Sequence, residues 1–263
     1  MLNPKAKLAE NIFDKPTERP TRDGFGLGLL ELGEKNKEVV VLCADLAEST
    51  RVLAFKEKYP NRYIELGVAE QNLATVASGL ANYGKIPFIT SYATFSPGRN
   101  NEQIRTTISL NNVPVKIAGS HAGLSVGPDG ATHQALEDIA LMRVQPNMTV
   151  LSPCDAEEAR KATLAAVAHA GPVYLRFARA NTPVMTTTAT PFEFGKILEV
   201  WKVADPEVII FATGPLLYNA LLSAKELEKK ISVVVVNVHT VKPLDAAAII
   251  KLAKKAGAVV TVE

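Results

Sequence analysis

Glu70 is a lone carboxylate placed at the start of a helical pattern, a setting in which it could do chemistry. The stretch from Tyr63 to Tyr83 reads YIELGVAEQNLATVASGLANY, a short strand, a turn at Gly67 and then a helix of small residues. A carboxylate in a first helical turn also has a purely structural explanation, since it complements the helix dipole by about 0.3–1 kcal/mol. The small interior residues predict that this helix lies very close to another one.

Two of the four histidines, His121 and His133, lie in the glycine-rich segment that begins at Gly119 and follows a predicted strand. Loops at strand ends are where binding and catalytic groups are often placed, so the pair indicates a functional site. Metal ligation is the competing interpretation, but no HxH or HxxxH spacing accompanies these residues. We interpret His169 and His239 as structural.

Composition narrows the class of protein. The chain has 263 residues, 47% of them hydrophobic, and a net charge of +2 with both signs interspersed, which predicts no nucleic-acid partner and no membrane surface. Cys43 and Cys154 have neither metal-ligand nor disulfide-scaffold spacing and are expected to be small buried residues. No signal core and no run near the roughly 18 apolar residues of a spanning helix is present, so we expect a cytoplasmic protein.

Strands and helices alternate along the first part of the chain, which predicts an α/β fold with a doubly wound parallel sheet. Val39–Leu42 is a continuous apolar run, typical of a strand buried on both faces. Asp45 and Ser49 follow it directly, at the carboxyl edge where open α/β sheets bind ligands. Thr21 is predicted to cap the first helix, and Ser96 with Pro97 to open a later one.

The chain divides into two predicted domains. Residues 1–183 form the first, 184–191 are a linker rich in Thr and Pro, and 192–263 form a second, smaller α/β domain. Residues 1–19 are polar and irregular, and we expect an arm that lies over the surface or over a partner.

Several segments, taken in order and at their intervals, resemble the pyrimidine-binding half of a transketolase. They are VLCADLAES, AEQ at residues 69–71, SYATF, GSHAGLSVGPDGATHQALED and LRFARANTP. The resemblance covers nearly the whole chain and is strongest at AEQ and at the GxDGxTHQ string of residues 127–134. It implies a thiamine diphosphate-dependent enzyme that transfers a two-carbon ketol unit between sugar phosphates.

The resemblance also implies which residues bind the cofactor. Glu70 shares a proton with a ring nitrogen of the aminopyrimidine and favours the imino form, whose exocyclic nitrogen deprotonates the thiazolium carbon. Phe95 matches the aromatic residue that stacks on the pyrimidine, with Tyr92 beside it, and Asp45 matches a carboxylate that lies against the cofactor. The family usually carries a second aromatic residue where this chain has Gly98.

The same resemblance implies a substrate site. His133 resembles a histidine that contacts sugar hydroxyls or shuttles protons, and Asp129 a carboxylate that selects their configuration. Guanidinium groups suit a phosphate because they bind two of its oxygens at once. The implied phosphate-holding set is Arg22, Ser49, His121 and Arg179.

The chain lacks the GDG segment and later asparagine pair with which this family holds Mg2+ and the diphosphate. We therefore expect one half of a split transketolase, which shares thiamine diphosphate with an amino-terminal subunit that supplies the Mg2+ ligands. Self-association into a homodimer is expected, and a dimer of heterodimers with the partner. A complete carboxyl-terminal domain of this family would continue past Glu263, so the second domain looks incomplete, as a fragment or as a unit completed by a partner.

Three alternatives remain open. 1-Deoxyxylulose-5-phosphate synthase and the β subunit of a pyruvate-type dehydrogenase share the glutamate and the fold. The DGATHQ string with Arg22 and Arg179 favours sugar phosphates over a pyruvate donor. A non-catalytic dimerising or regulatory subunit is the alternative from a different class, and it is favoured by Gly98 and the short second domain.

Overall fold

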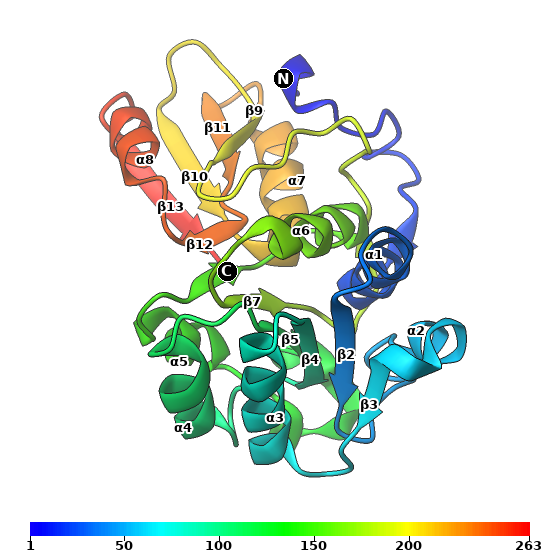
Figure 1. Cartoon of the computed structure of the whole chain (residues 1–263). Helices are drawn as coiled ribbons and strands as arrows, with labels where there is room; N and C mark the ends of the chain where they lie inside the picture. The colour runs from blue at the N-terminus through cyan, green and yellow to red at the C-terminus, as the bar shows by residue number, and fades with distance from the viewer.

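A seven-stranded sheet forms the centre of the first domain in the computed structural model, which describes residues 1–263 (Figure 1). Its order is β12-β6-β7-β5-β4-β2-β3, and every neighbouring pair is parallel except β12 with β6. The predicted doubly wound sheet is confirmed. Its strands are β2 (Val39–Cys43), β3 (Tyr63–Glu65), β4 (Ile86–Tyr92), β5 (Lys116–Ser120), β6 (Thr149–Leu151), β7 (Val173–Arg176) and β12 (Thr240–Lys242).

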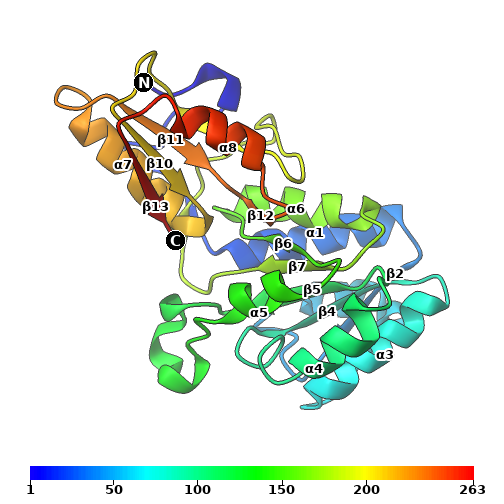
Figure 2. The same cartoon turned by 90° about the vertical axis from the view of Figure 1, so that its left-hand side faces the viewer.

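Helices cover both faces of this sheet, as Figure 2 shows. One face carries α1 (Thr21–Lys35), α2 (Leu53–Lys58) and α6 (Ala156–Ala168), with a core around Phe25, Phe55 and Phe88. The other carries α3 (Glu70–Asn82), α4 (Asn101–Gln103) with the π-helix Ile104–Ser109, and α5 (Asp138–Val144). Burial on both faces explains the continuous apolar runs of the central strands.

The second domain is a four-stranded sheet in the order β13-β10-β11-β9. Both Cys154 and Cys43 are buried, and Cys154 lies in the core shared with this domain, which confirms their interpretation as small buried residues. No helix of the structure is long and apolar enough to cross a membrane. The strands and helices of the second domain are β9 (Leu198–Trp201), β10 (Val208–Ala212), α7 (Leu217–Leu227), β11 (Val233–Asn237), α8 (Ala246–Ala253) and β13 (Ala258–Val262).

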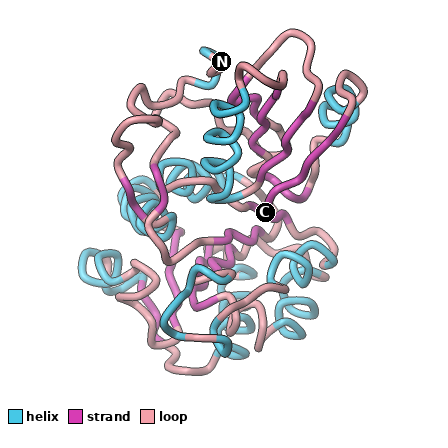
Figure 3. Tube along the Cα trace, turned by 180° about the vertical axis from the view of Figure 1, so that it is seen from behind, coloured by secondary structure: helices cyan, strands magenta, loops and turns pink.

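The amino-terminal segment packs into the second domain, beside which Figure 3 shows it. Leu2 forms a β-bridge with Trp201, and Ala6 and Ile12 are fully buried in the core of that domain. The hydroxyl of Tyr218 donates to the carbonyl of Ile12 at 3.0 Å. This segment is therefore part of a core, and β1 (Glu18–Arg19) pairs with β8 (Thr182–Pro183) where the chain enters the first domain.

One predicted helix start and one predicted helix cap are wrong. Residues 93–100 form successive turns, with the Ser96 amide donating to the Tyr92 carbonyl, and the helix begins only at Asn101. Thr21 does not cap α1, because its hydroxyl accepts the backbone N–H of Ala178 at 2.7 Å. That contact ties the end of β7 to the start of α1.

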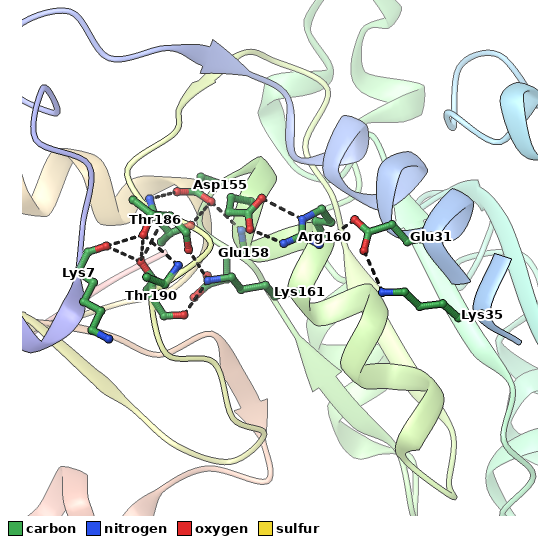
Figure 4. A network of polar contacts seen from close by, with 12 residues as sticks. Lys7, Glu31, Lys35, Asp155, Glu158, Arg160, Lys161, Thr186 and Thr190 are labelled. Carbon is green, nitrogen blue, oxygen red and sulfur yellow. Dashed lines mark hydrogen bonds and ion pairs between the residues drawn. The ribbon is translucent and has the colours of Figure 1, made fainter. Parts of the chain in front are cut away.

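A buried polar network joins the two domains, and Figure 4 shows it. Asp155 caps α6 and accepts hydrogen bonds from the Thr186 amide, at 2.6 Å, and hydroxyl, at 2.7 Å. Glu158 accepts from the Cys154 amide and from Asn237 Nδ2, both at 2.7 Å, and thereby links α6 to β11. Burial, reinforced by the nearby Asp155, raises the pKa of Glu158 to about 7.

Candidate active site

The predicted site residues gather at the carboxyl edge of the first sheet. Parallel strands end at the same edge of a sheet, so residues that follow them in sequence come together in space. The residues that follow these strand ends are Asp45 and Ser49 after β2, Glu70 after β3, Phe95 after β4, His121 after β5 and Arg179 after β7, with Tyr92 the last residue of β4.

Glu70 is the first residue of α3 and is only 3% exposed. Its backbone carbonyl accepts a hydrogen bond of 2.9 Å from Nδ2 of Asn100, which is fully buried and also lies 3.2 Å from Ser96 Oγ. The Oε2 atom of Glu70 is buried and has no partner. Buried polar atoms are nearly always paired, so this oxygen fits a ring nitrogen of a bound aminopyrimidine.

Four rings form a continuous cluster beside this edge. Tyr92 stacks on Phe95 with centroids 6.0 Å apart and on His121 with centroids 3.8 Å apart. His133 places its ring edge-on to Tyr92 at 6.0 Å and to Phe95 at 5.3 Å. The structure thus brings both histidines to the aromatic residues that the sequence predicted for the cofactor ring.

Gly98 stands where the family usually has a second aromatic residue. A Cβ atom at this position would lie 2.0 Å from the carbonyl oxygen of Thr94, far inside van der Waals contact. The turns of residues 93–100 therefore exclude every side chain at position 98, and the ring cluster is made without it.

Arg22 and His121 form the centre of a cationic subsite. Nη1 of Arg22 lies 2.9 Å from His121 Nε2 and donates to the Ser49 carbonyl at 2.9 Å. An arginine only donates, so Nε2 accepts, and the proton of the neutral ring sits on Nδ1, 2.9 Å from Ser120 Oγ. Burial, together with the charges of Arg22 and Arg179, lowers the pKa of His121 to about 3.

Arg179 reaches the same subsite because Ala178 is bound to Thr21 at the start of α1. Its Nη1 donates to the carbonyl of Val126 at 2.6 Å and holds the glycine-rich loop in place. The buried Nε of Arg22 has no partner, so the guanidinium presents a free donor in a setting suited to an anion.

The contacts above do not include Asp45 or Asp129. Asp45 donates its backbone N–H to Glu65 Oε1 at 2.8 Å, and Glu65 also accepts from the Gly67 amide at 3.0 Å. Asp129 ends the 3-10 helix Leu124–Asp129 in the loop held by Arg179.

Sequence reasoning missed Asn100 and Glu65, which fix the backbone around the site. Glu65 alternates with apolar neighbours in a short strand, and Asn100 follows a run of turns, so neither position carries a motif. Their roles come from hydrogen bonds to distant backbone groups.

Comparison with known proteins gives the family of this chain. Residues 17–185 match the transketolase pyrimidine binding domain and residues 199–263 match the transketolase C-terminal domain. A 6-deoxy-6-sulfo-D-fructose transketolase subunit from Clostridium sp. (strain MSTE9) is 40% identical over 250 residues, which are 95% of this chain and 77% of that protein. A putative transketolase C-terminal section from Methanocaldococcus jannaschii is 41% identical over 247 residues, 92% of this chain and 76% of that protein.

More distant relatives include a 1-deoxy-D-xylulose-5-phosphate synthase from Desulfotalea psychrophila, 36% identical over 91% of this chain and 37% of its own length. Among solved structures, a split gene transketolase described as an inactive β4 tetramer superimposes with a TM-score of 0.85 and 40% identity. The superposition covers 94% of this chain and 81% of the split gene transketolase chain.

The fold and the two domain matches define a protein built from a transketolase pyrimidine-binding domain and a transketolase carboxyl-terminal domain, the arrangement of a thiamine diphosphate-dependent family. More particularly, the chain belongs to the transketolase family, and its similar proteins include transketolase C-terminal sections and split transketolase subunits.

Proposed function

We propose that this chain is the pyrimidine-side half of a transketolase that moves a two-carbon ketol unit between sugar phosphates. It acts together with an amino-terminal subunit that holds the diphosphate and Mg2+. The observation that carries the proposal is the buried, unpartnered Oε2 of Glu70 at the carboxyl edge of the sheet. Thiamine diphosphate, held at its pyrimidine ring by Glu70 and Phe95, would supply a nucleophilic thiazolium carbon for ketol transfer.

The residues of this chain hold and orient the pyrimidine ring and the sugar, and they supply protons to both. Glu70 keeps a proton at the pyrimidine ring nitrogen, and Phe95 and Tyr92 provide an apolar wall for the ring. His133, at the edge of that wall, reaches the sugar hydroxyls and moves a proton there. We assign Asp45 to the cofactor and Asp129 to the configuration of the sugar hydroxyls, as the resemblance implies.

The anion of the sugar lies in the cationic subsite of Arg22, Ser49, His121 and Arg179. Arg22 offers its free Nε, and the neutral His121 is held between Arg22 and Ser120. Charge-assisted bonds of this kind are about twice as strong as neutral ones and fix the direction of the substrate.

A sulfonated sugar is the second candidate substrate. The relative from Clostridium sp. is named for 6-deoxy-6-sulfo-D-fructose, and a sulfonate is a tetrahedral anion that the same guanidinium groups bind. Steady-state kinetics with a 6-phosphate and a 6-sulfonate ketose, each at several concentrations, would assign the preferred anion.

Calorimetric titration of thiamine diphosphate with Mg2+ tests the division of the site. The titration is made into the chain alone and into the chain mixed with its candidate amino-terminal subunit, followed by an assay of ketol transfer. We expect tight binding and turnover only in the mixture. Tight binding to the chain alone would contradict the shared cofactor, and a mixture without ketol transfer would contradict the enzyme.

A further inference from the structure

Arg51 is a further cation, and it lies beside the anion subsite. This is the cationic subsite formed by Arg22, Ser49, His121 and Arg179. Asp23, the neighbour of Arg22 in the first turn of α1, accepts a hydrogen bond of 2.7 Å from Nε of Arg51. Ser49, two residues before Arg51, binds Arg22 through its carbonyl. Two adjacent residues of α1 therefore bind the turn that carries Arg51, and this places the arginine next to the subsite.

The backbone at Arg51 shows that this placement is specific. Arg51 has φ of 65°, a left-handed conformation that a non-glycine residue adopts only when the surrounding structure requires it. A Cβ atom at Gly26 would lie 2.6 Å from the carbonyl oxygen of Arg51, so α1 accepts this turn only because residue 26 is a glycine. Two local features thus hold a strained arginine against the first turns of α1.

The guanidinium of Arg51 is free to bind a ligand. Only its Nε is engaged, and the side chain is 39% exposed. Arg51 is close enough to lower the pKa values of both Arg22 and His121, after burial as the main cause. Arg22, Arg51 and Arg179 have a single carboxylate, Asp23, among them. The excess positive charge suits an anion with two negative charges.

We propose that Arg51 is a specificity-determining residue, whose two terminal nitrogens bind the terminal phosphate of the substrate while Asp23 holds Nε. The inference rests on the proposed function, because it concerns the same anion subsite. It selects a phosphate dianion over a single negative charge or a neutral sugar. The competing explanation is a surface ion pair between Arg51 and Asp23, which contributes little to stability or binding.

The first test uses the isolated chain with inorganic phosphate as the probe, followed by NMR of the His121 ring. Arg51→Gly removes the guanidinium and suits the positive φ, so the variant keeps its fold. We expect its dissociation constant for phosphate to rise about tenfold, the size expected for one lost charge-assisted contact. Arg51→Lys keeps the charge but not the fork of donors, so its dissociation constant should fall between those of the wild type and Arg51→Gly. Arg143→Gln, at an exposed position of α5, should bind phosphate as the wild type does.

The second test measures KM in the reconstituted enzyme for an acceptor aldose with and without its phosphate. Arg51→Gly should raise KM for the phosphorylated aldose about tenfold and leave KM for the unphosphorylated one unchanged. A wild type that binds phosphate while Arg51→Gly binds it equally well would overturn the role of Arg51 and leave the proposed function intact. A wild type that neither binds phosphate nor prefers phosphorylated sugars would overturn both.

Discussion

Nδ2 of Asn100 lies 2.9 Å from the backbone carbonyl oxygen of Glu70, with both residues buried. The segment after β4 thus fixes the first turn of α3, and the second acceptor of this amide, Ser96, lies within that same segment. The orientation of the candidate catalytic carboxyl group depends on a residue that has no charge.

Asn100→Ala should destabilise the folded chain. The substitution leaves the buried carbonyl of Glu70 without its donor, which costs about 1–3 kcal/mol. Urea unfolding of the variant measures the loss, with Asn72→Ala on the exposed face of α3 as the control. Equal midpoints for the two variants would mean that the hydrogen bond does not support the helix start.

Glu70→Gln should remove ketol transfer in the reconstituted enzyme while the fold is kept, because the amide cannot exchange a proton with the ring nitrogen. The rate should drop by about 10²–10⁴-fold, the usual contribution of a positioned acid or base. Glu102→Gln, exposed on α4, is the matched control. Wild-type turnover in the Glu70 variant would exclude this carboxyl from catalysis.

Glu158→Gln should change how stability depends on pH. The folded pKa of Glu158 is raised by burial to about 7 from 4.5, so the folded chain binds the extra proton between these values. The contribution of Glu158 to the free energy of unfolding is full below pH 4.5. It is lost as pH rises towards 7, by up to about 1.4 kcal/mol per pH unit.

Urea unfolding at several pH values between 5 and 8 would follow this change. The Gln variant, which is always neutral, should match the wild type at pH 5 and exceed it at pH 8. Glu226→Gln, exposed on α7, should follow the wild type throughout. Parallel curves for wild type and Glu158→Gln would show that the carboxyl is ionised in the fold at pH 5.

Lys116→Met should act in a different pH range and with the opposite sign. Burial lowers the folded pKa of Lys116 to about 7 from 10.5, although its Nζ donates to the carbonyls of His169 at 2.7 Å and Gly171 at 2.8 Å. Between pH 7 and 10.5 the unfolded chain binds the extra proton, so stability rises with pH by up to about 1.4 kcal/mol per unit. Between pH 7 and 10, the free energy of unfolding should change less with pH for Lys116→Met than for the exposed control Lys255→Met.

Gly79→Leu tests whether the expected homodimer forms through a close contact between two copies of α3. A Cβ atom at Gly79 meets nothing within 4 Å, and Val76, one turn earlier, is 37% exposed, so the single chain tolerates the larger residue. A close contact between two copies of this helix does not. We expect sedimentation to show a weaker dimer for Gly79→Leu and an unchanged one for Lys251→Leu on α8, whereas equal association would place the contact elsewhere.

The sequence predicted the parallel sheet because runs such as Val39–Leu42 carry the mark of strands buried on both faces. It did not predict β12, since Thr240–Lys242 is a short mixed segment that becomes a strand only by pairing with β6. The Ser96–Pro97 start was wrong because turn hydrogen bonds to the carbonyls of residues 92 and 93 take precedence over the helix preference of this dipeptide. Pairing with a distant strand decides β12, and local turns decide where the helix after β4 begins.

The site was predicted to the extent that its residues follow strands or match motifs. Glu70, Phe95 and His121 fall within such strings, whereas Arg22 was assigned through the family resemblance. The structure places Nη1 of Arg22 2.9 Å from Nε2 of His121. Asn100 and Glu65 act through hydrogen bonds to backbone groups, and Arg51 is held by an ion pair with Asp23. None of these contacts leaves a pattern in the order of amino acids.

Because β12 pairs with β6, the carboxyl-terminal part of the chain supplies an edge strand to the sheet of the first domain. The two domains are therefore not independent folding units. A fragment that ends within residues 184–191 would lose β12 and leave β6 as an open sheet edge, which invites pairing with other chains. A fragment that starts there would lose Ala6 and Ile12 from its core. We therefore expect the two domains to melt in one cooperative transition, and each domain expressed alone to aggregate.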